Sequence, residues 1–296
     1  MELLCILFLL FYYASASLQH GTKPNPLNPP FVPPKPEKVM VIRKVSPEIL
    51  TCSLPFARFG RIKIGGRGTI VRMANGHLVV FSPVALTDQV KAQTEGLGTV
   101  KYLVAPDIEH HLFLDPWHKQ YPDAKLIGSE ALKIKREKMG KPLPWTYIWK
   151  KDVQPSVDAE FDKEFEYTFV SAHPNKELVF NHKPTKTLIQ ADLMFNLPAT
   201  EQYSKSGVSP TSGFLTQAFT LFSSPQGTAI WQKRFTWYVF SAPDRPSFDK
   251  SVRIIDGWDF RRMIPCHGDV IERNAKEVFR KVFAWHLTAD GKKHVV

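Results

Sequence analysis

The sequence predicts a layered α/β fold, and three observations support this prediction. From residue 39 onward, short apolar runs typical of β-strands alternate with segments typical of helices. Several of the strand-type runs end in side chains that can bind metals, as expected at the edge of a layered sheet. The 296 residues are 43% hydrophobic, enough for a full core. We therefore expect one large domain over residues 39–296.

The domain is expected to open with a meander of antiparallel strands. Strand-type runs lie at residues 62–64, 69–73 and 77–82. Asn75-Gly76 separates the last two runs, and Asn-Gly between apolar runs is a strong signal for a two-residue hairpin turn. A helix over residues 87–96 should follow, with Thr87 or Asp88 as its N-cap.

The next strand-type run, Val100 to Val104, leads into a cluster of ligand-type side chains. Pro106 lacks a backbone N–H, which indicates that the strand has ended by that residue. A loop beyond the carboxyl end of a strand is a common place for a functional site in α/β proteins. The side chains gathered there are Asp107, Glu109, His110 and His111.

The rest of the domain alternates between strands and helices. Residues 140–158 contain three prolines, Trp145 and Trp149, and are expected to form a lid or a packing loop, with packing as the favoured role of the tryptophans. Residues 200–251 are expected to be a helical or irregular insertion. Further strands are expected at 124–128, 166–170, 178–182, 187–190 and 262–265, and helices at 117–121, 129–139, 252–258 and 274–286.

The first 38 residues are expected to lie outside the folded domain. Residues 1–16 combine an apolar run with the small-residue pattern Ala14-Ser15-Ala16, which indicates a secretory signal peptide. An uncleaved signal anchor is the alternative, because Glu2 stands where a basic residue is usual. Residues 17–38 are rich in proline and favour an extended linker, with a docking motif for a proline-reading partner as the alternative. We therefore expect a secreted or membrane-anchored protein.

Charge and cysteine content limit the function classes. The formal net charge of +11 would attract anionic surfaces, yet the 39 basic residues are scattered and form no nucleic-acid-binding motif. We expect no specific nucleic-acid binding, and binding to an anionic surface ranks last among the functions considered. Cys52 and Cys266 remain outside the signal segment, so one disulfide is possible.

Candidate ligands follow other strand-type runs as well. His173 and Asp192 lie beyond predicted strands in the middle of the chain, and His267 lies beyond the last one. Structural explanations exist beside the functional ones: His173 can be a solvent-exposed loop histidine, and Asp192 can cap a turn. The recurrence of ligand-type residues at strand ends favours a metal or proton-transfer site.

Several ordered motifs resemble the uncharacterised family known as domain of unknown function 4336, within the metallo-β-lactamase-like superfamily. The motifs are HLVVFSPVALT, YLVAP, HHLFL, YPDAKL, KTLIQADLMFN and IPCHGD, over about residues 55–290. The resemblance implies an αββα sandwich, in which two mixed β-sheets are flanked by helices and the site lies at one edge between the sheets. It also implies one or two metal ions.

The sequence departs from the superfamily's His-x-His-x-Asp-His loop. When the preceding strands are matched, Ala105 stands in place of the first histidine and Asp107 in place of the second. Glu109 takes the acidic position and His110 the last histidine. Because alanine cannot bind a metal, one of the two metal positions is depleted.

The remaining superfamily positions are matched. Ala172-His173 is similar to the Gly-His turn, Asp192 matches the bridging aspartate, and His267 matches the final histidine. The resemblance implies His110, His173, Asp192 and His267 as metal ligands. His110, Asp192 and His267 suffice for a catalytic zinc, which needs three protein ligands and one open position. Zinc is the first candidate, and iron or manganese are alternatives.

Two functions remain open. The first is a metal-dependent hydrolase with an atypical, mononuclear site acting on a small ester, lactone or phosphoester, in which Asp107 or Glu109 is the general base or a carboxylate that orients a histidine. The second is a non-catalytic scaffold of the same fold that binds a ligand or a protein partner. The missing histidine at Ala105 favours the second, and the retained Asp192 and His267 favour the first.

Overall fold

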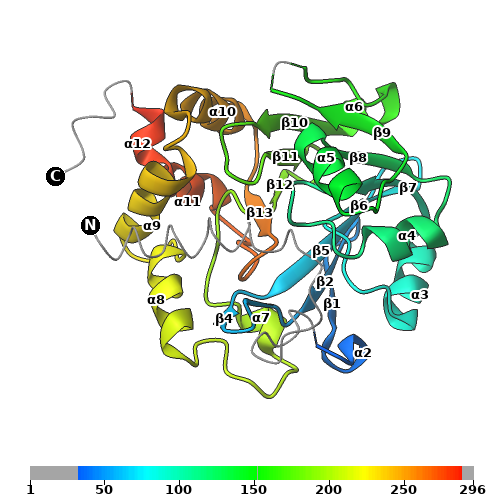
Figure 1. Ribbon diagram of the computed structural model, residues 1–296, viewed down its shortest axis with the longest axis horizontal. Coiled ribbons are helices and arrows are strands. Elements are labelled where there is room, and N and C mark those ends of the chain that lie inside the picture. The colour runs from blue at the N-terminus through cyan, green and yellow to red at the C-terminus, as the bar shows by residue number, and fades with distance from the viewer. Residues whose placement is uncertain (1–32, 152, 289–296) are drawn as a thin grey trace.

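The computed structural model describes residues 33–151 and 153–288. The expected signal segment, residues 1–16, and most of the expected linker lie outside these residues. The described part folds into two β-sheets packed face to face, with helices on both outer faces (Figure 1). This arrangement confirms the expected αββα sandwich.

The larger sheet has seven strands and changes from antiparallel to parallel pairing. β1, β2, β5 and β6 pair antiparallel, and the turn between β5 and β6 contains Gly76 at φ 86°. This confirms an opening meander, although the run expected at 62–64 pairs in a separate hairpin instead of joining it. The pairs from β6 to β9 are parallel, so the carboxyl ends of these strands share one edge. In sheet order the strands are β1 (Val41–Ser46), β2 (Ile49–Leu54), β5 (Gly66–Arg72), β6 (His77–Phe81), β7 (Thr99–Val104), β8 (Lys125–Ser129) and β9 (Trp145–Trp149).

The smaller sheet has four strands. Its first three strands pair antiparallel, whereas β12 and β13 pair parallel, with Gln190 opposite Pro265. The residues that follow these two strands therefore leave the sheet at the same edge. In sheet order the strands are β10 (Phe165–Val170), β11 (Glu177–His182), β12 (Thr187–Gln190) and β13 (Arg262–Pro265), and a separate hairpin is formed by β3 (Ala57–Arg58) and β4 (Ile62–Lys63).

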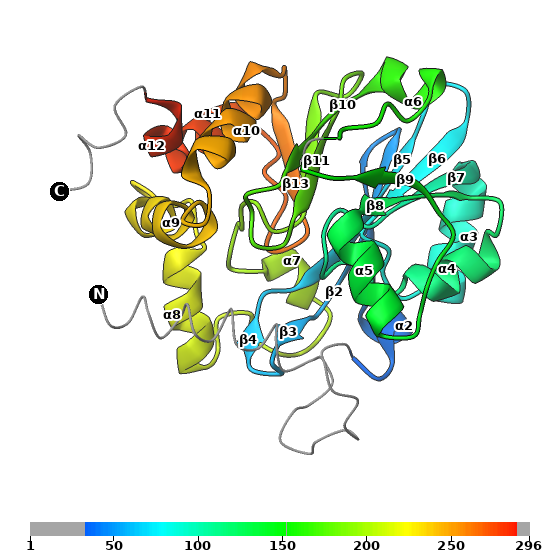
Figure 2. The same cartoon turned by 45° about the horizontal axis from the view of Figure 1, so that its top comes forward.

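Helices cover the outer face of each sheet (Figures 1 and 2). Three helices lie on the larger sheet: α3 (Asp88–Leu97), α4 (Leu114–Gln120) and α5 (Glu130–Lys138). The smaller sheet is covered by α8 (Phe214–Phe222), α9 (Ile230–Phe235), the π-helix η1 (Thr236–Phe240), α10 (Arg245–Gly257), α11 (Ala275–Val282) and α12 (Ala284–Leu287). Shorter helices are α2 (Pro36–Val39), α6 (Ala159–Glu164) and α7 (Thr200–Tyr203).

Strand alternation divides the core into three layers. In β6, Leu78 and Val80 pack under α3 to α5, whereas Val79 and Phe81 point between the sheets. Phe81 meets Phe180 of the smaller sheet with ring centroids 5.0 Å apart. Burying a side chain of this size contributes roughly 1.5–3 kcal/mol. The same two-residue period exists in both sheets, which is why both faces of each sheet are apolar.

Several expectations about individual elements were wrong. Residues 145–149 form strand β9 rather than a lid, because the alternating aromatic and β-branched residues are flanked by prolines and not interrupted by them. Trp149 is fully buried. The expected helix at 252–258 is the end of α10, which begins at Arg245. The expected C-terminal helix is divided at Phe283 into α11 and α12. Cys52 and Cys266 are free and buried.

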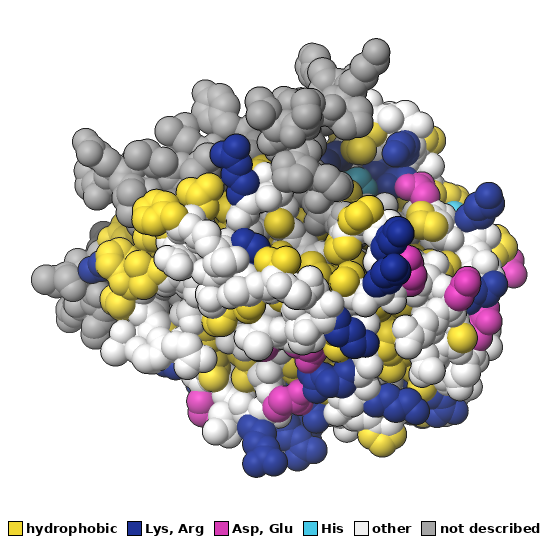
Figure 3. Space-filling model, turned by 90° about the horizontal axis from the view of Figure 1, so that it is seen from below, with side chains coloured by type: hydrophobic (Ala, Val, Ile, Leu, Met, Phe, Trp, Pro, Cys, Tyr) yellow, Lys and Arg dark blue, Asp and Glu magenta, His cyan; other side chains and the backbone are white. Residues whose placement is uncertain are grey.

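The described residues were compared with two expectations, a membrane anchor and a basic surface. No helix in the ranges 33–151 and 153–288 is long and apolar enough to cross a membrane. Lys and Arg side chains are spread over the face seen in Figure 3, interspersed with hydrophobic side chains, and form no single basic patch there.

Candidate metal centre

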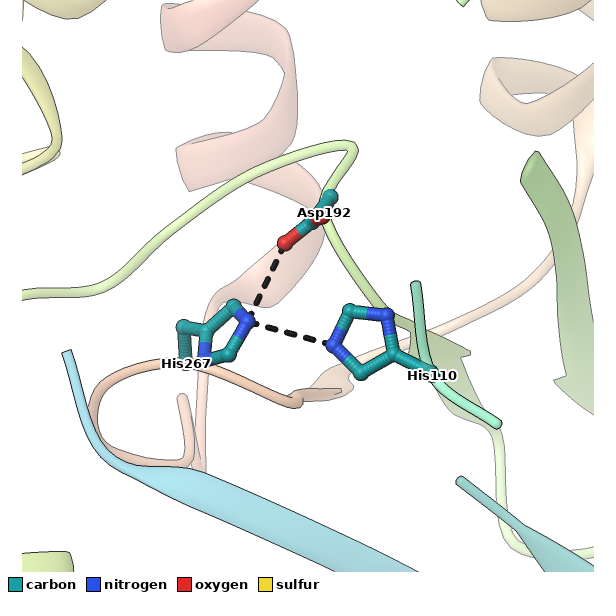
Figure 4. Close-up of side chains that lie close together, drawn as sticks. All are labelled: His110, Asp192 and His267. Atoms are coloured by element: carbon teal, nitrogen blue, oxygen red, sulfur yellow. Dashed lines mark hydrogen bonds and ion pairs between the residues drawn. The ribbon is translucent and has the colours of Figure 1, made fainter. Parts of the chain in front are cut away.

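Three ligand-type side chains meet at the edge where strands of both sheets end. His110 comes from the loop after β7, Asp192 from the residues directly after β12, and His267 from the residues directly after β13. The parallel pairing of β12 with β13 places Asp192 and His267 side by side. Figure 4 shows the three side chains pointing toward one another.

The distances within this cluster fit one metal ion. The Nε2 atoms of His110 and His267 are 3.1 Å apart, and His267 Nε2 lies 3.2 Å from Asp192 Oδ1. All three ligand atoms lie within 4.8 Å of one another. Zinc bound tetrahedrally at 2.0–2.1 Å would separate two nitrogen ligands by about 3.3 Å. The described structure therefore holds the ligand atoms close to the spacing that a metal requires.

The outer nitrogen of each imidazole has a partner that fixes the ring. His267 Nδ1 donates a hydrogen bond to the Gly65 carbonyl oxygen at 2.6 Å. His110 Nδ1 contacts both carboxylate oxygens of Asp107, at 2.8 and 2.9 Å. A neutral ring with its proton on Nδ1 turns the lone pair of Nε2 toward the centre of the cluster. A carboxylate or carbonyl behind a histidine is typical of metal sites.

Asp192 supplies the negative charge of the cluster. Its Oδ2 accepts a hydrogen bond from Asn175 Nδ2 at 2.6 Å, and its backbone N–H donates to Glu177. Its Oδ1 is buried and accepts no hydrogen bond within the described structure. A buried carboxylate oxygen without a donor is costly, and a cation between Asp192 and the two histidines would satisfy it. The residues present thus fit a divalent metal.

The pKa shifts of His110 and Asp192 also indicate that the cluster requires a positive charge. Burial lowers the pKa of His110, but the neighbouring carboxylates Asp107 and Asp192 outweigh burial and raise that pKa well above the usual value. Burial raises the pKa of Asp192, yet the charges of His110, His267 and Arg58 lower it overall. Without a metal, a proton on His110 therefore provides the positive charge that the cluster requires.

Two other histidines that were weighed as ligands lie outside this group of three. His173 is buried rather than solvent-exposed, its Nδ1 accepts a hydrogen bond from the backbone of Asn175, and burial lowers its pKa to about 4. His111 faces Arg136, with His111 Nδ1 3.2 Å from the guanidinium, and burial lowers its pKa to about 4.

The two carboxylates considered for catalysis occupy different places. Asp107 is fully buried behind His110 and also accepts hydrogen bonds from the backbone N–H groups of residues 109 and 110. Glu109 lines a cavity beside the cluster and forms an ion pair with Lys135 at 2.8 Å. Asp107 is thus placed to orient a ligand, and Glu109 to face a bound molecule.

The cavity beside the cluster has a volume of about 160 Å³. His110 and His267 form part of its wall, so a molecule inside would reach the presumed metal ligands. Trp145 and Trp149 are not among its lining residues, in agreement with their favoured packing role. Apolar side chains form most of the rest, namely Leu54, Phe56, Phe59, Pro83, Val84, Leu112 and Phe113.

Sequence reasoning missed the supporting residues. Gly65, which follows the strand-type run at 62–64, was not singled out, although its carbonyl orients His267. Glu177, directly before the strand expected at 178–182, was not singled out, although its buried carboxylate accepts from the backbone N–H groups of Ala191 and Asp192. A charged residue next to an apolar strand run was the available signal for Glu177. Asn175 and Arg58 carried no comparable signal, because Asn175 lies in a short turn and Arg58 in a strand of two residues.

The sequence was compared with models of known protein families and with curated proteins. Residues 59–205 match the model of a domain of unknown function, DUF4336. This segment of the chain is therefore similar to the DUF4336 family. The match is shorter than residues 55–290, over which the resemblance was noted in the sequence. No curated protein is significantly similar to this chain in sequence.

Solved structures similar to this chain have the metallo-β-lactamase fold. The DIM-1 metallo-β-lactamase is 12% identical, with a TM-score of 0.53 over 86% of this chain and 96% of that one. A metallo-β-lactamase from Pontibacter korlensis is 13% identical, with a TM-score of 0.52 over 83% and 97%. A mutant flavo di-iron protein from Thermotoga maritima is 12% identical, with a TM-score of 0.54 over 83% of this chain and 62% of that one. Identities this low show the fold alone.

Proposed function

We propose that this protein is a metal-dependent hydrolase with a mononuclear site, acting on a small ester, lactone or phosphoester. One observation carries this proposal. The Nε2 atoms of His110 and His267 and the unsatisfied Oδ1 of Asp192 converge, while the outer atoms of all three groups already have partners. Such preorganisation of three ligands is typical of a catalytic metal site.

His110, Asp192 and His267 would hold the metal. Three protein ligands leave one position open, and the cavity next to His110 and His267 gives a substrate access to it. Zinc is the first candidate because the set contains two imidazoles, and iron or manganese are alternatives. A divalent metal supplies Lewis-acid polarisation of the substrate and lowers the pKa of water.

The chain's own residues would divide the remaining tasks. Asp107 keeps the proton on His110 Nδ1 and fixes the ring, which makes it a positioning residue. Glu109 faces the cavity, where its carboxylate would accept a proton during hydrolysis. Lys135 holds Glu109 in place through its ion pair. Apolar side chains around the cavity would limit the access of bulk water.

Metal content tests the proposal. We would measure metals by mass spectrometry in the full-length chain, in the double variant Asp192→Ala, His267→Ala, and in a control double variant, His77→Ala, Asp123→Ala, at positions that are not fully buried. About one equivalent of zinc, iron or manganese in the parent and the control, and none in the site variant, is expected. A folded parent that takes up no added metal would overturn the proposal.

Hydrolysis is measured next, with chromogenic esters, lactones and phosphoesters. A metal-loaded parent should hydrolyse at least one class, and the site variant should not. The second candidate function is a non-catalytic scaffold that binds a ligand or partner. It is favoured by Ala105, which is fully buried and offers no ligand where the superfamily places a histidine. Metal uptake without hydrolysis of any of these classes would favour it.

We also propose that residues 1–16 direct the chain into the secretory pathway, with an uncleaved membrane anchor as the alternative. The support is the apolar run that ends in Ala14-Ser15-Ala16. Sequencing the N-terminus of the protein purified from its own cells tests this proposal. A new N-terminus near residue 17 is expected, whereas an intact Met1 on protein from the cytosol would contradict it.

A further inference from the structure

The wall of the cavity beside the metal cluster is apolar over most of its extent. Phe56 and Phe59, on either side of strand β3, form one part of it, and Leu112 and Phe113 form another. Leu112 is 55% exposed, so a molecule in the cavity would cover an apolar side chain that otherwise faces water. The ring of Phe56 stacks on that of His267, with centroids 6.0 Å apart. An apolar group in the cavity would therefore lie against a presumed metal ligand.

The size of the cavity limits this apolar group. Its volume of about 160 Å³ is close to that of apolar cavities of about 150 Å³ that bind benzene. The cavity thus holds a group of about one aromatic ring.

Both arginines of the cavity wall already act within the protein. Arg67 is fully buried and donates hydrogen bonds to the carbonyl oxygens of Pro265 and Gly268, at 2.7 and 2.6 Å. The charge of Arg58 acts on Asp192, whose pKa it helps to lower. An anionic group that entered the cavity would lose its hydration and would have to compete with these contacts for a cation.

The negative charge of the wall is also paired. Of the described residues that line the cavity, Glu109 is the one carboxylate, and it forms an ion pair with Lys135 at 2.8 Å. A cationic group in the cavity would therefore have to displace Lys135. Because either sign of charge is disfavoured, the cavity is suited to an uncharged apolar group.

The metal cluster itself offers little positive charge to an anion. A divalent metal would carry two positive charges, which are offset by the carboxylate of Asp192 and by that of Asp107 behind His110. A phosphate monoester brings about two negative charges to such a site, and enzymes commonly compensate them with a second metal or with arginine and lysine side chains. An ester or lactone is uncharged and develops one negative charge only during the reaction.

We propose that the cavity binds an uncharged apolar group of about one aromatic ring, and that the substrate is therefore an uncharged ester or lactone rather than a phosphoester. The binding of an uncharged apolar group follows from the cavity alone. The choice of substrate class rests on the proposed hydrolase function.

The binding of four small probes tests the assignment of the cavity. Acetophenone carries an uncharged ring, benzoate a ring with a negative charge, benzylamine a ring with a positive charge at neutral pH, and acetone no ring. Titrations of the full-length chain, followed by NMR, are run after treatment with EDTA, so that no probe binds through a metal. We expect acetophenone to bind at least tenfold more tightly than each of the other three. Any of the three binding as tightly as acetophenone, or no binding of acetophenone, would overturn the proposal.

A charge placed in the wall should weaken this binding. Leu112→Asp should reduce the affinity for acetophenone at least fivefold, and its exposure makes loss of folding unexpected. Leu112→Phe keeps the wall apolar and should retain the affinity. The matched control is Ile134→Asp in helix α5, a residue that is 44% exposed and does not line the cavity. Unchanged affinity in a folded Leu112→Asp protein would contradict the assignment.

Hydrolysis by the metal-loaded chain tests the substrate class. Phenyl acetate and phenyl phosphate carry the same ring and differ in the group that is cleaved. We expect kcat/KM for phenyl acetate to be at least tenfold higher, after subtraction of the rate with metal-free protein. If phenyl phosphate is hydrolysed at least as well, the hydrolase stands and this inference fails. If the chain takes up no metal but prefers acetophenone among the probes, the hydrolase fails and the assignment of the cavity stands.

Discussion

The Nε2 atoms of His110 and His267 lie 3.1 Å apart, although 157 positions separate the two residues in the sequence. Each ring has its Nδ1 bonded to an acceptor, so two lone pairs face each other. Two lone pairs at this distance repel unless a proton or a metal ion lies between them. This pair of atoms is therefore the most direct structural argument for a cation site.

Variants of the neighbouring residues His110 and His111 should show which of the two binds the metal and which only packs in the protein. His110→Ala should reduce the metal content of the full-length chain to near zero, because one of three ligands is lost. His111→Ala should retain one equivalent of metal and lower the free energy of unfolding by about 1–3 kcal/mol, since Arg136 loses a buried partner. Mass spectrometry and urea unfolding measure the two effects. Metal loss in the His111 variant alone would reverse the assignment of the ligand.

The carboxylate behind His110 should tune metal affinity without abolishing it. Asp107→Asn removes the negative charge that holds the proton on His110 Nδ1. We expect metal affinity to fall about 10- to 100-fold, as for other carboxylates behind a histidine ligand. Competition with a chelator measures this affinity. Asp115→Asn, which changes a carboxylate paired with Arg136, is the matched control. Equal affinities in the two variants would refute a positioning role for Asp107.

Gly268 should be required for the position of His267. Its φ is 86°, and a Cβ there would lie 2.1 Å from the Asn196 carbonyl oxygen. We expect Gly268→Ala to lower the free energy of unfolding by about 1–3 kcal/mol and to weaken metal binding, because the backbone beside His267 must move. Urea unfolding and chelator competition measure the two effects.

The matched replacement is Gly96→Ala in helix α3, where no atom lies within 4 Å of the added Cβ. Alanine should stabilise that helix by about 0.5–1 kcal/mol and leave metal binding unchanged. A Gly268→Ala protein that resembles the parent in both measurements would show that the loop tolerates a different backbone.

Acid should destabilise the protein partly through His286, which is not part of the metal cluster. Burial lowers the pKa of His286 below 6.5 in the folded state, despite its contact with Asp249 at 2.7 Å. As the pH falls through 6.5, the unfolded chain gains a proton that the folded chain refuses, so stability decreases by up to about 1.4 kcal/mol per pH unit.

His286→Phe should flatten this dependence, since phenylalanine can pack against the rings of Phe248 and Trp237 that surround His286. Urea unfolding of metal-free parent and variant between pH 7 and pH 5 measures the two slopes. Metal-free protein is used because release of a metal in acid would add a slope of its own. Identical slopes would show that His286 is protonated in both states alike.

Local sequence signals identified most of the elements. Thr87 and Ser129 were expected to start helices, and their side chains accept hydrogen bonds from Val90 and Leu132. Asn75-Gly76 correctly placed a hairpin, because its turn depends on two adjacent residues. The expectation for residues 145–149 failed because a short aromatic run becomes a strand only when a neighbour such as β8 offers a partner.

The sequence by itself determined the layered fold class, the strand ends and the ligand types that follow them, because each depends on residues close together in the chain. Only the tertiary structure decided that His110, Asp192 and His267 meet while His111 and His173 turn elsewhere. It also brought Arg58 to the same cavity. The three ligands come together only when β12 pairs with β13 and one sheet packs on the other. These long-range contacts leave no local pattern in the sequence.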